Sequence, residues 1–352
     1  MNATKRFSII LGLLLIASPF SILNAQKPNA HLLDTGGIRV MFYNCENFFD
    51  TIDDPNKDDA EYLPSSQKKW NTEKYLKKVD HIARVVYSVD SVHLPVFAGF
   101  TEIEDGDVLK DLVKTSWLKK GKYKCVHFET SDPRGVDPAL IYRPDVMKVA
   151  DAHLISVFYD SKSDKSTREI LYVKGIIGKD TLHIFVNHWK SRIGGTEETD
   201  PKRMAYAKTL RANVDNILAA HHDAKILIMG DFNDTPLDES VHYGLGAITA
   251  DTVISDDKLY NLMYEKAKNG EGSHKFDGWE MLDQMIVSGS TLSDKAAGIR
   301  FDSKKTAVFQ MPFMMYKTKE GAFEPSRTYS GTRYFGGYSD HLPVYTTMYF
   351  RK

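Results

Sequence analysis

One stretch, Ala224–Asp234 (AKILIMGDFND), constrains the fold of this chain more than any other. Its apolar run, Ile226–Met229, reads as a buried strand that stops at Gly230, and Asp231 and Asn233 follow. Residues two apart on an extended backbone point the same way, so the carboxylate and the carboxamide face one side of the strand end. Such a pair suits a hard cation and a phosphate, although these residue types also favour a simple Asx turn.

Two further strand ends carry polar groups in the N-terminal third of the chain. The segment Ile38–Asp50 (IRVMFYNCENFFD) alternates so that Asn44 and Glu46 lie on one strand face, next to its end. A second apolar run is followed by Glu102 and Glu104, of which Glu102 directly follows the run and is the better ligand candidate. A strand that simply reaches solvent would explain each feature alone, but the repeated form favours function.

Two histidines occupy similar positions. A predicted strand leads into His188, which is accompanied by Lys190 and Arg192. A lone histidine at a strand end is more often structural, whereas the basic neighbours favour a site for an anion. Near the C-terminus, Asp340 and His341 stand just before the last predicted strand.

A carboxylate also stands inside an apolar run. Asp283 lies within Trp279–Ser288 (WEMLDQMIVS), which reads as one strand. Burying a carboxylate is costly unless it is paired. We therefore expect Asp283 to have a positive or hydrogen-bonding partner.

Helices and hairpins separate these strand ends. Helical spacing predicts helices over 70–89, with Asn71 or Thr72 as the N-cap, over 106–118 and over 202–220. Strand patterns occur at 123–128, 139–142, 170–177, 181–186 and 343–349, and loop patterns at 51–64 and 194–199, while 235–278 and 301–325 show little pattern. Polar groups that emerge from several such strands argue for one shared pocket at one edge of packed sheets.

The N-terminus reads as a secretory signal peptide. Lys5 and Arg6 precede an apolar run, Ile9–Ile16, and small residues follow up to Ala25. The run is short for a spanning helix, and a retained membrane anchor is the alternative. We expect a signal peptide at 1–25, an N-terminal extension at 26–37 and a single domain at 38–352. Cleavage implies export, to a periplasm or to the outside.

Charge and cysteine content exclude two classes of protein. The full chain has 46 basic and 47 acidic residues, so a strongly basic nucleic-acid footprint over the whole chain is absent, while a local basic groove is compatible with this balance. Cys45 and Cys125 are too few for a disulfide framework. We expect two separate buried thiols, with a disulfide as the alternative in an oxidising compartment.

Taken together, the motifs resemble the endonuclease/exonuclease/phosphatase superfamily, the deoxyribonuclease I-like fold. The resemblance covers roughly 38–350 and rests on motifs in the expected order: YNCEN, GFTEIE, VNHWKSR, GDFND, LDQMIVS and SDHLPV. It implies an α/β (α+β) fold, a four-layer α-β-β-α sandwich of two packed mixed sheets flanked by helices. The stretches DPRGVDPALIYRPD and NHWKSRIGG, with Arg203 downstream, are similar to a secreted nuclease-like branch.

The resemblance implies a metal centre. Glu102 with Asn44 would hold a divalent cation, Mg²⁺ or Mn²⁺ with Ca²⁺ as a further option, assisted by Glu46 and Asp340; oxygen ligands fit such a hard ion. Two departures from the family pattern affect positions around the key carboxylates. The sequence has LDQM where the family has an Arg-Ile-Asp-Tyr-type strand, and FTE where it has Leu-Gln-Glu.

The resemblance also implies the hydrolytic residues. His341 would act as general base towards water, with its imidazole oriented by Asp283. A different account of the family gives proton abstraction to Asp231. Asp231 and Asn233 would position water and phosphate, and His188 would contact the scissile phosphate.

These roles describe an exported metal-dependent phosphoric-ester hydrolase, first of all a nuclease, and we expect a monomer without a stable membrane span. Arg134 or Arg192 would add positive charge at the phosphate. Basic side chains could track a nucleic-acid backbone and tyrosines could stack bases: Lys190, Arg192, Arg203, Arg327, Arg333, Tyr329, Tyr334 and Tyr338. The alternative is a small-molecule phosphodiesterase or phosphatase acting on sugar, inositol or lipid phosphates, as sphingomyelinases of this architecture do. A binding module that has lost catalysis is a third hypothesis, against which the intact polar set argues.

Overall fold

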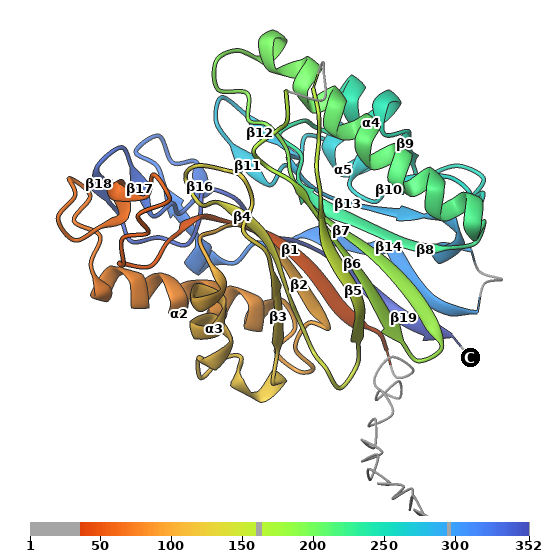
Figure 1. Ribbon diagram of the computed structural model, residues 1–352, viewed down its shortest axis with the longest axis horizontal. Helices are drawn as coiled ribbons and strands as arrows, with labels where there is room; N and C mark the ends of the chain where they lie inside the picture. The colour runs from red at the N-terminus through yellow and green to blue at the C-terminus, as the bar shows by residue number, and fades with distance from the viewer. Residues whose placement is uncertain (1–35, 160–163, 294–296, 352) are drawn as a thin grey trace, which may run out of the picture.

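Two mixed β-sheets form the centre of the structure (Figure 1). This computed structural model describes residues 36–159, 164–293 and 297–351, so the predicted signal peptide and most of the extension after it lie outside the described residues. In order across the sheet, the six-stranded sheet consists of β14 (Gly298–Val308), β19 (Val344–Arg351), β1 (Ile38–Phe48), β2 (Phe97–Ile103), β4 (Asp137–Tyr142) and β3 (Lys124–His127).

The second sheet has seven strands. In order, they are β5 (Lys148–Ile155), β6 (Ile170–Ile177), β7 (Asp180–His188), β8 (Lys225–Asp231), β13 (Asp283–Ser288), β10 (Leu259–Asn261) and β9 (Ala247–Thr249). Three two-stranded ribbons lie outside the sheets: β11 (His274–Lys275) with β12 (Trp279–Glu280), β15 (Met315–Lys317) with β16 (Phe323–Pro325), and β17 (Tyr329–Ser330) with β18 (Arg333–Tyr334).

Helices cover the outer face of each sheet. The helices α2 (Thr72–Val89) and α3 (Gly106–Lys114) share an apolar cluster with the six-stranded sheet, and α4 (Thr196–Ala220) shares one with the seven-stranded sheet. A short helix, α5 (Tyr264–Lys268), lies between β10 and β11 along the chain. The predicted four-layer sandwich is confirmed. No helix in the described part of the chain is long and apolar enough to cross a membrane.

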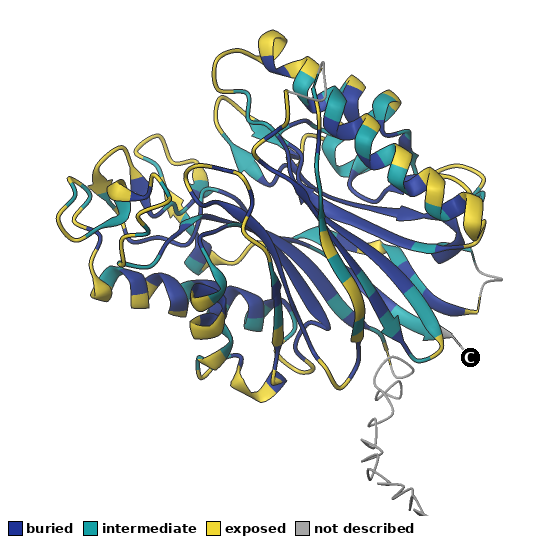
Figure 2. Cartoon of the chain, viewed as in Figure 1, coloured by how far each residue is buried: buried dark blue, intermediate teal, exposed yellow. Residues whose placement is uncertain are grey.

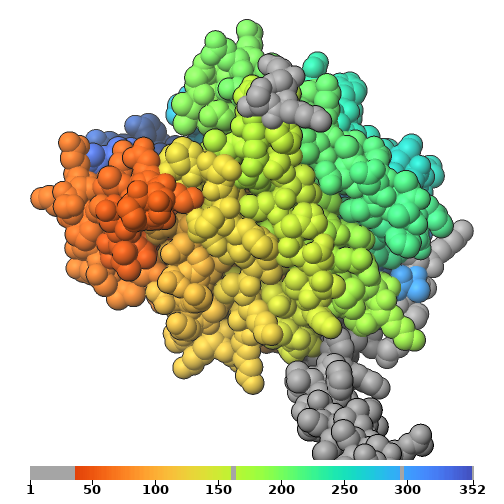
Figure 3. Space-filling view, viewed as in Figure 1, coloured from red at the N-terminus to blue at the C-terminus, as the bar shows by residue number. Residues whose placement is uncertain are grey.

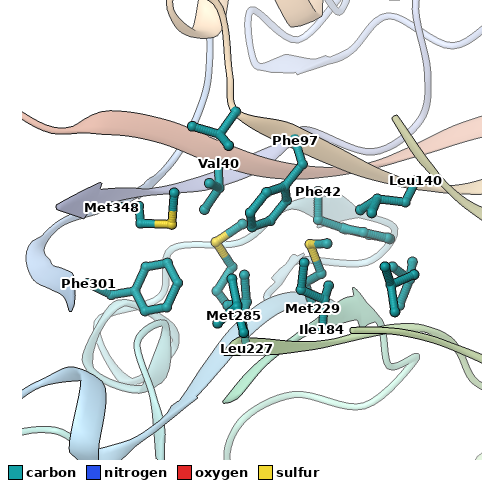
Figure 4. Packing of buried hydrophobic residues seen from close by; sticks show 14 of the residues in the cluster. Val40, Phe42, Phe97, Leu140, Ile184, Leu227, Met229, Met285, Phe301 and Met348 are labelled. Carbon is teal, nitrogen blue, oxygen red and sulfur yellow. The ribbon is translucent and has the colours of Figure 1, made fainter. Parts of the chain in front are cut away.

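The main core lies between the two sheets. Figure 4 shows Phe42 and Phe97 of the six-stranded sheet facing Met229 and Met285 of the seven-stranded sheet. All four side chains are fully buried, and each such burial contributes roughly 1.5–3 kcal/mol to folding. Figure 2 shows the same division, with buried strands inside and exposed residues on the outer helices and loops.

The strand directions bring the polar strand ends together. The strand β1 runs parallel to β2, and β7 runs parallel to β8, so within each pair the carboxyl ends lie at the same edge. In the register, His188 stands opposite Asp231, and Asp231 stands opposite Asp283 at the start of the antiparallel strand β13. Gly230 permits this closeness, because a Cβ there would lie 2.3 Å from the Asn187 carbonyl oxygen.

Segments far apart in the sequence also close one side of the molecule. In Figure 3, the segments after β1, in orange, and the loop before β19, in dark blue, lie together. The contact is anchored by Lys78, whose ammonium donates to Thr328 Oγ1 at 2.7 Å and to the Tyr338 carbonyl at 2.7 Å.

The structure corrects several predicted boundaries. The second predicted helix ends at Lys114 rather than at 118, because the Thr115 hydroxyl caps the Leu112 carbonyl at 2.9 Å. The helix predicted from 202 begins at Thr196, so the loop predicted at 194–199 is mostly helical; the Thr199 hydroxyl stabilises this first turn by donating to the Gly195 carbonyl at 2.8 Å. The predicted N-cap of α2 is confirmed, with Asn71 Oδ1 accepting from the Lys74 amide at 3.1 Å.

Three strand predictions are also corrected. The segment predicted as one strand at 279–288 is divided into β12 and β13, so that Asp283 begins a strand instead of lying inside one. The 301–325 region contains most of an eleven-residue strand, β14, which the sequence pattern did not reveal. Alternation along β1 stops after Asn44, because Glu46 and Asn47 have positive φ angles of 50° and 48°.

Candidate active site

The carboxylate of Asp283 is paired with the imidazole of His341. Asp283 Oδ2 lies 2.7 Å from His341 Nδ1, and Asp283 is completely buried. Burial alone would lower the pKa of His341, but the carboxylates of Asp283 and Asp231 outweigh it and raise that pKa well above its ordinary value. The expectation that Asp283 has a positive partner is therefore met by an imidazole that holds its proton.

A buried serine that the sequence did not single out holds this pair in place. Ser273 Oγ accepts a hydrogen bond from the Asp283 amide at 2.9 Å, and the Ser273 carbonyl accepts one from the Leu342 amide at 2.7 Å. The next residue, His274, forms a backbone bridge to His341, and their rings lie 4.6 Å apart. The segment from Ser273 thus fixes both partners. No motif marks it, since its role depends on a long-range contact.

Asp231 lies between two histidines. Its Oδ2 atom is 3.8 Å from His188 Nε2, 3.9 Å from His341 Nε2, and accepts a 3.0 Å hydrogen bond from Asn44 Nδ2. Burial raises the pKa of Asp231 to about 7, against the opposing effect of His341. This carboxylate can therefore accept a proton near neutral pH.

Asn233 lies beside Asp231 but in a turn. The Asn233 amide donates to Asp231 Oδ1 at 2.9 Å, and Asn233 has a φ of 52°. Its side-chain amide donates to the Trp189 carbonyl at 3.1 Å. The segment is thus an Asx turn that also carries Asp231 into the site, so the two interpretations of this stretch are compatible.

Glu102 is held at the end of β2 in a left-handed conformation, with a φ of 62°. Its Oε2 atom accepts from the Asn47 amide at 2.7 Å. Its Oε1 atom lies 3.4 Å from Asn44 Nδ2 and 3.7 Å from His188 Nε2. The structure thus brings together Asn44, Glu102, His188 and Asp231, as the sequence predicted.

Glu46 and Asp340 line a neighbouring cavity of about 360 Å³, together with Asn47, Tyr62 and Lys68. The Glu46 carboxylate accepts backbone hydrogen bonds from Thr328 at 2.6 Å and from Tyr329 at 3.3 Å. Burial and the Asp340 charge raise the pKa of Glu46 to about 7. Glu46 therefore holds the loop before β19 against β1, in addition to facing the cavity.

The donors around Glu102 fit a divalent cation. Glu102 and Asp231 present carboxylate oxygens, which hard cations prefer as ligands. Asn44 links the two carboxylates through its side-chain nitrogen, while its Oδ1 atom accepts from the Glu46 amide at 3.0 Å. The Glu102 carboxylate keeps 17% of its side-chain surface exposed, so it is open to an ion. Glu102 could therefore hold a metal, which would supply charge stabilisation at phosphorus; the predicted ligand Asn44 would need to free its Oδ1 atom from the Glu46 amide.

A second group of potential ligands, His127, Glu129 and Asp137, has its own cation. Lys57 Nζ lies 3.1 Å from Glu129 Oε2, and His127 Nε2 lies 2.9 Å from Asp137 Oδ2. Lys57 offsets the charge of Glu129, and Asp137 Oδ1 accepts from the Thr130 amide at 3.0 Å and hydroxyl at 2.5 Å. We do not assign it a metal.

Arg168, which the sequence reasoning missed, contacts His188. Its Nη1 atom lies 2.8 Å from His188 Nε2 and donates to the Trp189 carbonyl at 2.9 Å. Burial and the nearby Arg168 and Arg134 lower the pKa of His188 well below its ordinary value. His188 is thus neutral, with Nε2 accepting from the guanidinium. The only sequence signal was an arginine just before a predicted strand.

The predicted substrate-binding residues have different surroundings. Arg134 and Lys190 line one cavity with Arg168. Arg192 instead forms ion pairs with three carboxylates, those of Asp234 at 3.2 Å, Asp238 at 2.9 Å and Glu280 at 2.7 Å.

Several members of the predicted nucleic-acid groove are buried or paired. Arg203 is completely buried and lies 2.6 Å from Asp234, and Tyr329 and Tyr338 are buried.

The two cysteines do not form a disulfide. Cys45 is buried and Cys125 half-buried, and both are free thiols.

A buried His–Asp pair beside clustered carboxylates, at one edge of two packed sheets, is the arrangement of a phosphoesterase. The chain belongs to the Endonuclease/Exonuclease/phosphatase family, whose model matches residues 39–350. A search of curated proteins found no match.

Solved structures share the fold at low sequence identity. An endonuclease/exonuclease/phosphatase family protein from Bacteroides thetaiotaomicron is 15% identical, with a TM-score of 0.55 over 89% of this chain and 95% of that chain. The human nocturnin catalytic domain with bound sulfate is 16% identical, with a TM-score of 0.54 over 89% and 94%. TDP2 from D. rerio, complexed with a single-strand DNA product, is 16% identical, with a TM-score of 0.51 over 89% and 99%.

Proposed function

We propose that this chain is an exported, metal-dependent phosphodiesterase, and first of all a nuclease. The observation that carries the proposal is the position of Asp231 between His188 and His341, with Asp283 behind His341. This arrangement supports a mechanism in which a proton acceptor and an imidazolium act at the same phosphate. The Glu102 carboxylate, linked to Asp231 through Asn44, would add a cation site next to them.

In this proposal Asp231, rather than His341, takes the proton from the attacking water. The raised pKa of His341 keeps its imidazole protonated, and an imidazolium cannot accept a proton. Asp231, with a pKa of about 7, can. His341 Nε2–H would donate to a phosphate oxygen, while Asp283 holds the ring and stabilises its charge. Arg168 would stabilise the charge that develops on the opposite side of phosphorus.

Two cavities flank the site, and a diester has two arms. One cavity, of about 360 Å³, is lined by Glu46 and Asp340; the other, of about 330 Å³, is lined by Arg134, Arg168 and Lys190. A chain of contacts connects them through Glu102 and His188. We propose that a phosphodiester bound at Glu102 places one substituent in each cavity, which would favour diester over monoester substrates.

The second candidate is a small-molecule phosphodiesterase or phosphatase. It is favoured by the ion pairing of Arg192 and Arg203 and by the burial of Tyr329 and Tyr338. These side chains are less free to track a long nucleic acid than the sequence suggested. A sugar, inositol or lipid phosphate would need fewer contacts outside the two cavities.

The test is hydrolysis by purified mature protein with Mg²⁺, Mn²⁺, Ca²⁺ or EDTA. Plasmid DNA, RNA, bis-p-nitrophenyl phosphate and a panel of phosphomonoesters are compared in parallel. EDTA-sensitive cutting of DNA or RNA supports the nuclease. Activity confined to monoesters or small diesters supports the second candidate, and no hydrolysis of any ester contradicts both.

Export is tested separately. We propose cleavage near Ala25, from the basic start and the apolar run at Ile9–Ile16. N-terminal sequencing of the protein recovered from the periplasm or medium should find a chain that begins shortly after Ala25. A full-length chain that remains in the cytoplasm would contradict this proposal.

A further inference from the structure

A cavity of about 330 Å³ opens beside the catalytic edge. We call it the basic cavity; its lining includes Asp132, Arg134, Arg168, Lys190 and Tyr206. Arg168 belongs to both places, because its guanidinium lines the basic cavity and lies 2.8 Å from His188 Nε2. The Arg168 side chain therefore lies between the basic cavity and His188, where the proposed reacting phosphate would bind.

The basic cavity carries more positive than negative charge. Asp132 is shared by two arginines: its carboxylate lies 3.2 Å from Arg134 Nη2 and 3.3 Å from Arg168 Nε. Lys190 has no carboxylate within ion-pair distance among the residues that the structure describes. Three cations thus face one carboxylate. Burial, and after it the neighbouring cations Arg168 and Lys202, lower the pKa of Lys190.

One of the cationic groups, Arg168, is held in place by the fold. Arg168 is buried, and its backbone carbonyl accepts a 2.7 Å hydrogen bond from the Tyr206 hydroxyl. The Ser166 hydroxyl lies within hydrogen-bonding distance of Tyr206 and accepts from the Tyr159 hydroxyl at 2.9 Å.

The Arg168 guanidinium uses Nε for Asp132 and Nη1 for His188 and the Trp189 carbonyl, which leaves Nη2 as the donor for an anion. A fixed guanidinium loses little freedom when it binds an anion.

We propose that the basic cavity binds a second phosphate group of the substrate, adjacent to the phosphate that is hydrolysed. This inference rests on the proposed function and deepens it. The second phosphate could be the next linkage of a nucleic acid or a terminal phosphate, since both offer the same anionic oxygens. Lys190 and Arg134 would neutralise it, and Arg168 would lie between the two phosphates.

The experiment compares substrates that differ by one phosphate. Thymidine 5′-(p-nitrophenyl phosphate) is offered with a 3′-phosphate or a 3′-hydroxyl, and thymidine 3′-(p-nitrophenyl phosphate) with a 5′-phosphate or a 5′-hydroxyl. We expect about a tenfold or larger gain in kcat/KM from the added phosphate in one isomer, the size that a hydrogen bond between charged groups gives. Equal rates within both pairs would overturn the proposal.

Substitutions in the basic cavity test whether the gain in kcat/KM from the added phosphate arises there. Lys190→Met, and Arg134→Gln as a second variant, should reduce the ratio between the paired substrates towards one, whereas Lys304→Met, at an exposed lysine on β14, should keep it. An unchanged ratio in both folded cavity variants would overturn the assignment. A dinucleotide with an internal phosphate or a methylphosphonate, compared with a terminally phosphorylated nucleoside, distinguishes the two sources.

A binding experiment tests this inference independently of the proposed function, because it does not require hydrolysis. Calorimetry measures thymidine 3′,5′-bisphosphate and both monophosphates against wild type and Lys190→Met. Bisphosphate bound at least about tenfold tighter by wild type, with the advantage lost in Lys190→Met, supports the basic cavity even if no ester is hydrolysed. Equal affinities would overturn the basic cavity while leaving the hydrolysis test unaffected.

Discussion

Asp231 and Asp283 stand directly opposite each other on β8 and β13, and their carboxylates approach the same imidazole from its two nitrogens. Asp283 Oδ2 is 2.7 Å from His341 Nδ1, and Asp231 Oδ2 is 3.9 Å from His341 Nε2. The strand register therefore fixes a line from Asp283 through His341 to Asp231. Asp283 contacts the Nδ1 side of the ring, and Asp231 lies on the Nε2 side, where we propose that substrate binds.

Replacing Asp283 by asparagine should slow turnover while the fold persists. Asparagine keeps the shape of the side chain but removes the charge that stabilises the imidazolium, so we expect kcat to fall about 100-fold or more, with little change in metal affinity. Steady-state kinetics and a melting curve measure this. Asp256→Asn, at an exposed aspartate, is the control. A wild-type rate in Asp283→Asn would show that His341 does not work through Asp283.

The pH profile should depend on Asp231. Its pKa of about 7 means that the ionised form, which accepts the proton, accumulates as the pH rises through about 7. The kcat/KM of wild type should therefore increase across that range. Asp231→Asn should lower activity about 100-fold or more and abolish this limb. A profile that keeps the same limb in the variant would assign the titrating group to another residue.

Ser273→Ala should affect catalysis as well as stability. The change leaves the buried Asp283 amide without its 2.9 Å partner, which costs about 1–3 kcal/mol and loosens the Asp283–His341 pair. Ser290→Ala is the matched control, because Ser290 is also buried and its hydroxyl donates to the Ala224 carbonyl at 2.8 Å, at a site outside the catalytic cluster. We expect similar melting temperatures for the two variants but a lower kcat only in Ser273→Ala; equal kcat values would limit Ser273 to a structural role.

Glu104 should make the protein less stable at alkaline pH. Burial and the charges of Asp50 and Asp105 raise the pKa of Glu104 to about 8, above the value in an unfolded chain. The stability from its protonated form is fully present below the unfolded pKa and is lost as the pH rises through about 8. Glu104→Gln keeps a neutral acceptor at every pH. The melting temperature of the variant minus that of wild type should therefore increase by a few degrees from pH 5 to pH 9. Glu239→Gln, at an exposed glutamate, should show no such trend. A constant difference for Glu104→Gln would contradict the pKa shift.

The sequence predicted the residues that follow regular strands. Asn44, Glu102, His188 and Asp231 each end or nearly end an apolar run, and the parallel pairing of those strands brings their side chains together. Asp283 was found because an acid in an apolar run needs a partner. These inferences needed only local periodicity and the cost of burying charge.

The remaining features depend on contacts that no local pattern encodes. Ser273 and Arg168 lie outside recognisable motifs and take their roles from partners on distant strands. Glu46 does not lie on the strand face predicted for it, because positive φ angles at Glu46 and Asn47 end the alternation of β1. Arg192 looked available for phosphate because the sequence does not show that three carboxylates surround it.

Metal-dependent hydrolysis through Asp231 is tested most directly with bis-p-nitrophenyl phosphate: the rate of wild type is measured during a Mg²⁺ or Mn²⁺ titration, with Asp231→Ala in parallel. If Asp231 takes the proton from water in a metal-dependent reaction, the wild-type rate rises with the metal, returns to background in EDTA, and is lost in Asp231→Ala at every metal concentration. A wild-type rate that is unaffected by EDTA, or an Asp231→Ala variant as active as wild type, would contradict this mechanism.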